Sequence, residues 1–185
     1  GKKIISKGNH DYWWSSISKL NVMYENMKFI QNNFYTYNDY AICGTRGWVS
    51  PDSEKFTEKD AKIYAREAIR LRLSLESAKK LGYSKIIVMI HYPPFNEGDE
   101  ESEFMKIFKE YNVEKIVIGY PLNMNATKGP RVQKTDKFIE KLVNRFHLEV
   151  IKIDERLTTV SAHRTMQELA IGKDKKRKIV DTISA

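Results

Sequence analysis

Three polar side chains, Asn9, His10 and His91, follow predicted strands and are of types that bind cations or move protons. Asn9 and His10 lie in KGNHDYWW, directly after a short β-prone run, and His91 ends the apolar run KIIVMIH. The amide oxygen of Asn9 can bind a hard cation, and the imidazole of His10 can donate a proton to a leaving alkoxide. A histidine is also common as a hydrogen-bonded packing residue, and this alternative stays open for His91.

A second group of candidate residues, in DERLTT (154–159), follows a predicted strand nearer the other end of the chain. The carboxylates of Asp154 and Glu155 can hold Mg²⁺ together with its water shell. Arg156 can bind a phosphate through two hydrogen bonds, and Thr158 can contact a backbone oxygen. The alternative is a surface strand end followed by a helix cap, because Thr is a common N-cap residue.

The basic run KDKKRK (173–178) contains Lys175, Lys176 and Arg177, and it contributes to a formal net charge of +8. Such a run can attract the phosphates of RNA or of another structured nucleic acid, with an affinity that falls as salt rises. The same pattern is common on the solvated face of a helix. The charge therefore favours a polyanionic partner only weakly.

Alternating strands and helices must position these residues. The sequence predicts strands over 3–6, 85–91, 115–119 and 148–154, a hairpin over 34–48 that turns at Asn38 and Asp39, helices over 15–26, 101–111, 132–146 and 160–170, a long helix that ends at Gly82, and a basic helix from about 174. This order indicates an α/β architecture with a largely parallel sheet in its second half. The continuous apolar run 85–91 predicts a strand that is buried on both faces.

Composition narrows the setting of the protein. Cys43 is the only cysteine, which excludes an internal disulfide and is typical of a reducing compartment, so we expect a cytoplasmic protein. We find no signal peptide and no apolar run long enough to span a bilayer, so no membrane partner is expected. The first residue is Gly and the final KIVDTISA stops inside an apolar helical pattern, so we expect a fragment at both ends. Nothing in the sequence indicates an oligomer.

The motifs KGNHDYWW, ICGTRGW (42–48) and MIHYPPFNE (89–97) closely resemble the calcineurin-like metallophosphoesterases, over about residues 1–119. The resemblance implies that Asn9 and His91 are metal ligands and that His10 is the general acid. Paired metals would polarise the phosphoryl oxygen and supply a hydroxide. The family's opening Asp-x-His and Gly-Asp motifs have no counterpart here. Gly119-Tyr120-Pro121 stands where its closing Gly-His-x-His is expected, so most metal ligands are missing.

The motifs VIGYPLNMNATKGP, FIEKLVNRF, DERLTTVSAHRTM and KKRKIVDTISA resemble the C-terminal half of the YqgF/RuvX family, over about residues 114–185. This family is ribonuclease H-like and is described as Holliday junction resolvase-like and as a pre-16S rRNA nuclease. The resemblance implies a site with Asp154, Glu155 and a further acidic residue, Asp181, on the last helix. It also implies Mg²⁺ or Mn²⁺. Tyr120 departs from the family's common Leu, and the family's first strand, with its Asp-x-Gly, has no counterpart, so metal binding is expected to be weak.

The two resemblances predict a composite chain, with a calcineurin-like part over 1–113 and a YqgF/RuvX part over 114–185. The predicted fold is α/β: a partial metallophosphoesterase sandwich followed by a partial ribonuclease H-like parallel-sheet unit. The segment 109–119 fits both families, so the identity changes at Gly119–Tyr120. The predicted function is metal-dependent phosphoester hydrolysis, in which a nuclease role in rRNA processing is favoured because DERLTT and Asp181 are present.

Three alternatives stay open. The chain could act as a calcineurin-like metallophosphoesterase, with reduced activity because ligands are missing. It could be a non-catalytic nucleic-acid-binding module that uses the basic C-terminal run. It could also be a non-functional chimera that joins two genes by recombination or misassembly.

Overall fold

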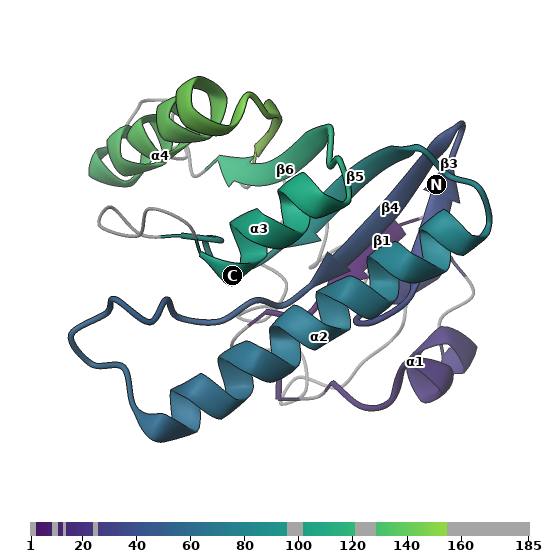
Figure 1. Ribbon diagram of the computed structural model, residues 1–185. Coiled ribbons are helices and arrows are strands. Elements are labelled where there is room, and N and C mark those ends of the chain that lie inside the picture. The colour runs from purple at the N-terminus through teal and green to yellow at the C-terminus, as the bar shows by residue number, and fades with distance from the viewer. Residues whose placement is uncertain are drawn as a thin grey trace. The chain divides into compact units, whose positions relative to one another are not determined.

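The computed structural model describes residues 3–8, 11–12, 14–23, 26–95, 102–120 and 129–154. The chain divides into two units, of which only the described residues are discussed below. Unit 1 comprises Gly1–Gly8 with Trp14–Ile116, and unit 2 comprises Asn9–Trp13 with Val117–Ala185. Each unit is described by itself below (Figure 1). The predicted helices over 160–170 and from 174 lie outside the described residues.

The described strands form two sheets. A two-stranded sheet pairs β1 (Lys3–Ser6) with β2 (Met27–Ile30) in parallel, and a five-stranded sheet has the order β3-β4-β5-β6-β7. The hairpin is confirmed: β3 (Phe34–Tyr37) and β4 (Tyr40–Thr45) are antiparallel. Asn38 takes a left-handed conformation with φ 51°, which asparagine tolerates in turns. β4 and β5 (Lys85–Ile90) run parallel, so their carboxyl ends lie at one edge of the sheet.

The longest helix, α2 (Glu58–Lys80), packs against β4 in unit 1 (Figure 1). It begins with a capping box, in which the Thr57 hydroxyl accepts from the Asp60 N–H and the Asp60 carboxylate accepts from the Thr57 N–H. It ends next to Gly82, whose φ of +84° glycine adopts readily. The sequence predicted this end, and α2 positions the polar residues described below.

The predicted buried strand is half right. β5 alternates: Ile86 and Val88 are fully buried, whereas Ile87 and Met89 are only partly buried. Ile86 and Val88 pair with Ala41 and Cys43, on the face where the Cys43 thiol contacts the backbone of α2. The face of β5 that carries Ile86 and Val88, on the side of α2, is therefore fully buried, whereas the opposite face is only partly buried. The apolar run alone did not predict this difference between the two faces. The strand also ends at Ile90, so His91 lies one residue beyond it.

The two shorter helices predicted in unit 1 are confirmed with slightly shorter bounds, and one strand between them was not predicted. The helix predicted over 15–26 is α1 (Ile17–Met23), and the strand β2 that follows it was not predicted. β2 is four residues long and its described pairing is with the distant β1, so no local turn signal marks it. The helix predicted over 101–111 is α3 (Glu103–Glu110), which the side chain of Ser102 caps.

Unit 2 contains the end of β6 (Lys115–Tyr120), α4 (Pro130–Phe146) and β7 (Glu149–Asp154). α4 starts with Pro130 in its first turn, where a missing N–H costs no helical hydrogen bond. It ends at His147 in a left-handed conformation. A small apolar cluster joins the three elements: Tyr120, Val132 and Ile139 are buried, and Ile118 and Val150 pack against them.

Candidate functional site

Most residues of the two predicted sites lie outside the described part of the chain: Asn9, His10, Glu155, Arg156, Thr158, Lys175, Lys176, Arg177 and Asp181. The backbone of Asp154 ends β7, as predicted, but its side chain is not described. Of the predicted side chains, only His91 is placed. Within the described ranges no three His, Cys, Asp or Glu side chains are grouped to hold a metal ion.

His91 lies at the carboxyl ends of β4 and β5, where backbone hydrogen bonds hold it. The N–H groups of His91 and Tyr92 both donate to the carbonyl oxygen of Arg46, at 3.2 and 3.0 Å. The ring of Tyr92 meets the rings of both His91 and Trp48, with centroids 5.3 and 5.2 Å apart. Gly47 allows this close approach, because its φ is +73° and an added Cβ would lie 3.0 Å from Ile90.

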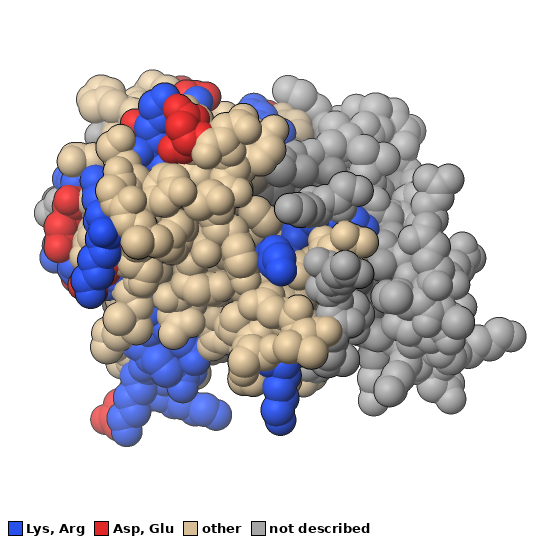
Figure 2. Space-filling view, turned by 90° about the vertical axis from the view of Figure 1, so that its right-hand side faces the viewer, with Lys and Arg blue, Asp and Glu red and all other residues tan. Residues whose placement is uncertain are grey.

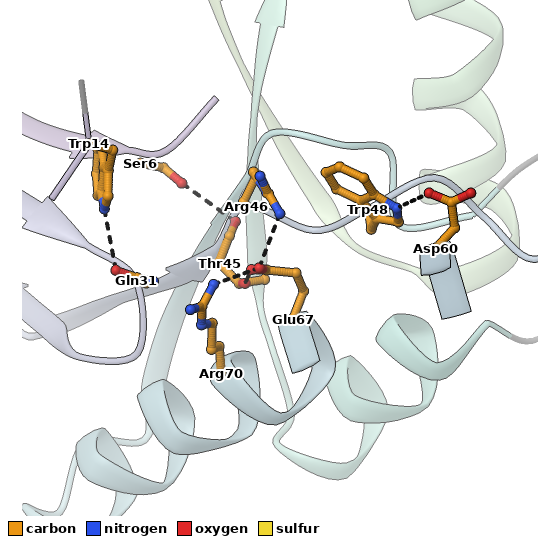
Figure 3. A network of polar contacts seen from close by, with 9 residues as sticks. All are labelled: Ser6, Trp14, Gln31, Thr45, Arg46, Trp48, Asp60, Glu67 and Arg70. Atoms are coloured by element: carbon orange, nitrogen blue, oxygen red, sulfur yellow. Dashed lines mark hydrogen bonds and ion pairs between the residues drawn. The ribbon is translucent and has the colours of Figure 1, made fainter. Parts of the chain in front are cut away.

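A buried carboxylate on α2 organises the same strand end. Glu67 is fully buried, and its two oxygens accept from the Thr45 hydroxyl at 2.7 Å and from Arg70 at 2.6 Å. Arg46 also reaches Glu67, with a separation of 3.4 Å between Nη2 and Oε1. Figure 3 shows both guanidinium groups directed at this one carboxylate, Arg70 from the helix and Arg46 from the end of β4. The Glu67 carboxylate therefore links α2 to β4.

An aromatic ring contacts Arg46, and a backbone hydrogen bond joins the neighbouring Thr45 to β1. Its guanidinium lies 4.3 Å from the centre of the Trp48 ring, a cation–π arrangement, and Trp48 donates to Asp60 at 2.9 Å (Figure 3). The Ser6 hydroxyl, at the end of β1, donates to the Thr45 carbonyl at 3.4 Å. The carboxyl ends of β1, β4 and β5 are thus joined within unit 1, which is where ligands bind in many α/β proteins.

Burial lowers the pKa of the Arg46 guanidinium, and the neighbouring Arg66 and Arg70 lower it further, whereas Glu67 and the Tyr92 ring act in the opposite direction. The sequence reasoning missed Glu67, Arg46 and Arg70. A signal was present, because Glu67 precedes Leu71 by four residues and so falls on the buried stripe of α2. A charged residue on such a stripe indicates a buried ion pair.

Unit 2 has a smaller polar cluster at the end of β6. The Tyr120 hydroxyl donates to both Asp136 oxygens, at 2.8 and 2.9 Å. Lys152 of β7 donates to Asp136 at 3.0 Å and lies 4.6 Å from the centre of the Tyr120 ring. This cluster ties α4 to β6 and β7 two residues before Asp154. Its tyrosine is the position where the sequence departs from the YqgF/RuvX pattern.

The surface charge is dispersed where it can be seen. On the face in Figure 2 the described Lys and Arg side chains stand in separate groups divided by uncharged surface. The predicted basic run at 173–178 lies outside the described residues. Among the described helices, none combines the length and apolar composition that a membrane crossing requires.

A model of the RuvX family, described as Holliday junction resolvase, matches residues 88–185, which is more than half of the chain. The chain belongs to the RuvX family. The matched range starts at Val88 in β5, upstream of the predicted start of this resemblance at 114. The matched range therefore includes α3 and the whole of β6. Part of this stretch, residues 109–119, is the segment that fits both resemblances in the sequence analysis.

Two relatives illustrate the match. A candidate pre-16S rRNA nuclease of Ruminiclostridium cellulolyticum is 60% identical over 80 residues, which are 43% of this chain and 56% of the relative. One of Clostridium tetani is 44% identical over 90 residues, 49% of this chain and 65% of the relative. The chain thus spans a little more than half the length of these curated relatives. A crystal structure of a Thermus thermophilus protein aligns over 56% of this chain and 46% of that one, with 16% identity and a TM-score of 0.36, too low to bear on the fold.

Proposed function

We propose that the chain carries the C-terminal half of a metal-dependent RuvX-type nuclease that acts on precursor 16S rRNA in the cytoplasm. The observation that carries this proposal is the RuvX family match over residues 88–185, which contain DERLTT, together with the 60% identity over 80 residues to a candidate pre-16S rRNA nuclease. The free, buried Cys43 is compatible with a reducing compartment. In this proposal RNA is the partner, and the described fold supplies the β6–α4–β7 support for the site.

Asp154, Glu155 and Asp181 would be the catalytic carboxylates, and Asp154 would also hold the metal. Carboxylate oxygens at a strand end are the ligands that Mg²⁺ and Mn²⁺ prefer, and β7 ends at Asp154, so this donor set fits such an ion. When bound, the ion would activate water and stabilise charge on the phosphate. Arg156, Thr158, Lys175, Lys176 and Arg177 would hold the RNA backbone through its phosphates.

We expect reduced activity. The Asp-x-Gly strand of the family has no counterpart in residues 1–113, and a site with fewer carboxylates holds a divalent ion less tightly. The lost strand would also leave the metal less well shielded from water.

The test is cleavage of a 5′-extended 16S rRNA transcript by the whole chain, with Mg²⁺ or Mn²⁺ and with EDTA. We expect metal-dependent cleavage that Asp154→Asn abolishes, whereas Asp136→Asn on the neighbouring helix retains it. Salt-sensitive RNA binding without cleavage, unchanged in Asp154→Asn, would instead support the non-catalytic binding module. Neither binding nor cleavage would contradict both.

A second candidate is calcineurin-like phosphoester hydrolysis by residues 1–113, with Asn9 and His91 as metal ligands and His10 as acid. One observation favours it: Ser6 and His91 are tied to consecutive residues, Thr45 and Arg46, at the end of β4. Hydrolysis of p-nitrophenyl phosphate with Mn²⁺ tests it; loss of hydrolysis in His91→Ala but not in Asp154→Asn is the expected result.

The composite origin of the chain needs its own test. Amplification across codons 100–135 from source DNA should yield one continuous product if the two parts form a single gene. Absence of such a product would mean a chimera made by misassembly, and both enzymatic proposals would fall with it.

A further inference from the structure

The side of α2 that faces away from β4 carries exposed apolar residues. Leu71, Leu75 and Ala78 are buried on the side of the helix that packs on the sheet. Ile69 and Leu73 lie on the opposite side, where they are 58% and 43% exposed. In Figure 1 α2 crosses in front of β4, and no other described helix or strand of unit 1 lies in front of it. Because these two large side chains are four residues apart, they form one apolar spot on the surface of the helix.

Cations extend this apolar spot in both directions along the helix. Lys62 and Arg66 precede it and Lys80 follows it, at spacings of three, four or seven residues that keep side chains on one helix face. All three side chains are exposed, and within the described part of the chain none of them forms an ion pair. We refer to Lys62, Arg66, Ile69, Leu73 and Lys80 as the outer face of α2.

The acidic residues of α2 leave the outer face positively charged. Glu67 is buried toward β4, where it binds two arginines. Asp60 is held in the capping box of the first turn, and Glu76 accepts a hydrogen bond from Tyr111 at 3.4 Å. Glu58 is exposed in the first turn, but no ion pair joins it to the described cations of the outer face. Among the residues that the structure describes, the outer face thus presents three unpaired cations around two apolar side chains.

The composition of the outer face selects among partners. A membrane surface is disfavoured, because the longer apolar side of α2 is buried against β4 and the outer face has too few apolar residues for the helix to lie in a bilayer. The same face of a second copy would bring cations against cations. A nucleic acid would use the cations but not the aliphatic side chains, since bases stack on aromatic rings. An apolar centre between cationic ends instead complements a helix with an apolar centre between acidic ends.

We propose that the outer face of α2 is a docking surface for an acidic amphipathic helix of another protein. Ile69 and Leu73 pack against apolar side chains of the partner helix, and the three cations pair with its Asp and Glu side chains. From Lys62 to Lys80 the outer face extends about 27 Å, which a partner helix of about five turns matches. This surface lies in unit 1 and involves no residue of either proposed catalytic site.

Binding of a peptide to the full chain tests the surface. The probe is a fluorescent, helix-forming peptide of about 18 residues, with two leucines at i, i+4 spacing in its centre and glutamates toward both ends. We expect saturable binding, measured by fluorescence anisotropy, that weakens as sodium chloride rises. Ile69→Ser should weaken this binding about tenfold, since one apolar anchor is lost. The matched control is Val143→Ser on α4, at a residue that is 43% exposed, as Leu73 is.

A charge exchange guards against misfolding. A second peptide carries lysines in place of the glutamates at one end. It should bind the double variant Lys62→Glu, Arg66→Glu more tightly than it binds the original chain, a gain that a misfolded protein would not show.

Three results would overturn the proposal. The first is no saturable binding of the acidic peptide, or equal binding by the original chain and Ile69→Ser. The second is self-association of the chain in place of peptide binding, abolished by Ile69→Ser in analytical ultracentrifugation, which would assign the outer face to a second copy. The third is binding to phosphatidylglycerol vesicles in place of peptide binding, abolished by the same variant, which would assign the outer face to a membrane.

Discussion

The two units each use a helix carboxylate to hold a hydroxyl and a cation from neighbouring strands, but they differ in burial. In unit 1, Glu67 of α2 binds Thr45 and Arg46 of the β4 end and Arg70 of its own helix. In unit 2, Asp136 of α4 binds Tyr120 of β6 and Lys152 of β7. The Glu67 side chain is 0% exposed, whereas that of Asp136 is 35% exposed.

This difference decides how strongly each carboxylate matters. Water can replace Asp136 as a partner for Lys152, because both side chains reach solvent. Water has little access to Glu67, so its loss would leave two guanidinium groups without their counter-ion. We therefore expect loss of the Glu67 carboxylate to destabilise unit 1 strongly, and loss of the Asp136 carboxylate to destabilise unit 2 only slightly. Four changes test this contrast, taken from the largest expected effect to the smallest.

The largest effect should come from Glu67→Gln. We expect it to lower the free energy of unfolding by about 3 kcal/mol, the typical cost of removing one partner from a buried ion pair. Urea unfolding measured by circular dichroism gives this value. Arg72→Gln, at a partly exposed pair on the same helix, is the control and should cost much less. A change below about 1 kcal/mol for Glu67→Gln would contradict the contrast with an exposed pair.

Tyr120→Phe comes next, because the tyrosine is buried although its partner is not. It removes the hydroxyl that Asp136 accepts from and leaves the ring in the apolar cluster. We expect a loss of about 1 kcal/mol, the usual net value of one hydrogen bond. Tyr120→Leu introduces the residue that is common in the family, and it measures the contribution of the aromatic ring to stability in addition to that of the hydroxyl. Equal free energies of unfolding for the original chain, Tyr120→Phe and Tyr120→Leu would mean that neither the hydroxyl nor the ring of Tyr120 contributes to stability.

Lys152→Gln should have a smaller effect. Its ion pair with Asp136 is about two-fifths exposed on both sides, so we expect about 0.5 kcal/mol or less, reduced further at high salt. The measurement is urea unfolding at low and high sodium chloride. An effect as large as that of Glu67→Gln would show that exposure does not separate the two carboxylates.

The smallest effect should come from the exposed pair of Asp39 and Lys85. Because this pair lies in unit 1 but is exposed, it shows whether burial or membership of unit 1 sets the cost of removing a carboxylate. The hydrogen bond that Lys85 donates to the Asp39 carboxylate lowers the pKa of Asp39. The group thus contributes stability that is fully present above its unfolded pKa and is lost as pH falls through the folded pKa. We expect Asp39→Asn to be nearly neutral at pH 7, and its small difference from the original chain to vanish under acid. A large loss at pH 7 would show that membership of unit 1, and not burial, sets the cost.

Local signals in the sequence predicted most elements of the fold. The hairpin at Asn38 and the end of α2 near Gly82 follow from residues whose backbone preferences act over a few positions. The helix predicted over 132–146 is also present, although it starts two residues earlier, at Pro130. The RuvX resemblance rested on consecutive residues such as DERLTT, and the family match confirms it over the C-terminal part. The calcineurin-like part and the residues of both catalytic sites stay predictions.

Only the tertiary structure decided which distant groups meet. β2 was missed because it pairs with β1, twenty-four positions away in register. Glu67 was missed because two of its partners, Thr45 and Arg46, lie at the end of β4, far from α2 in the sequence. The sequence alone determined helix, turn and strand where the cause is local backbone preference and apolar periodicity. Burial and ion pairing depend on which faces the folded chain brings together, and only the structure could assign Glu67 to a buried network and Asp136 to an exposed one.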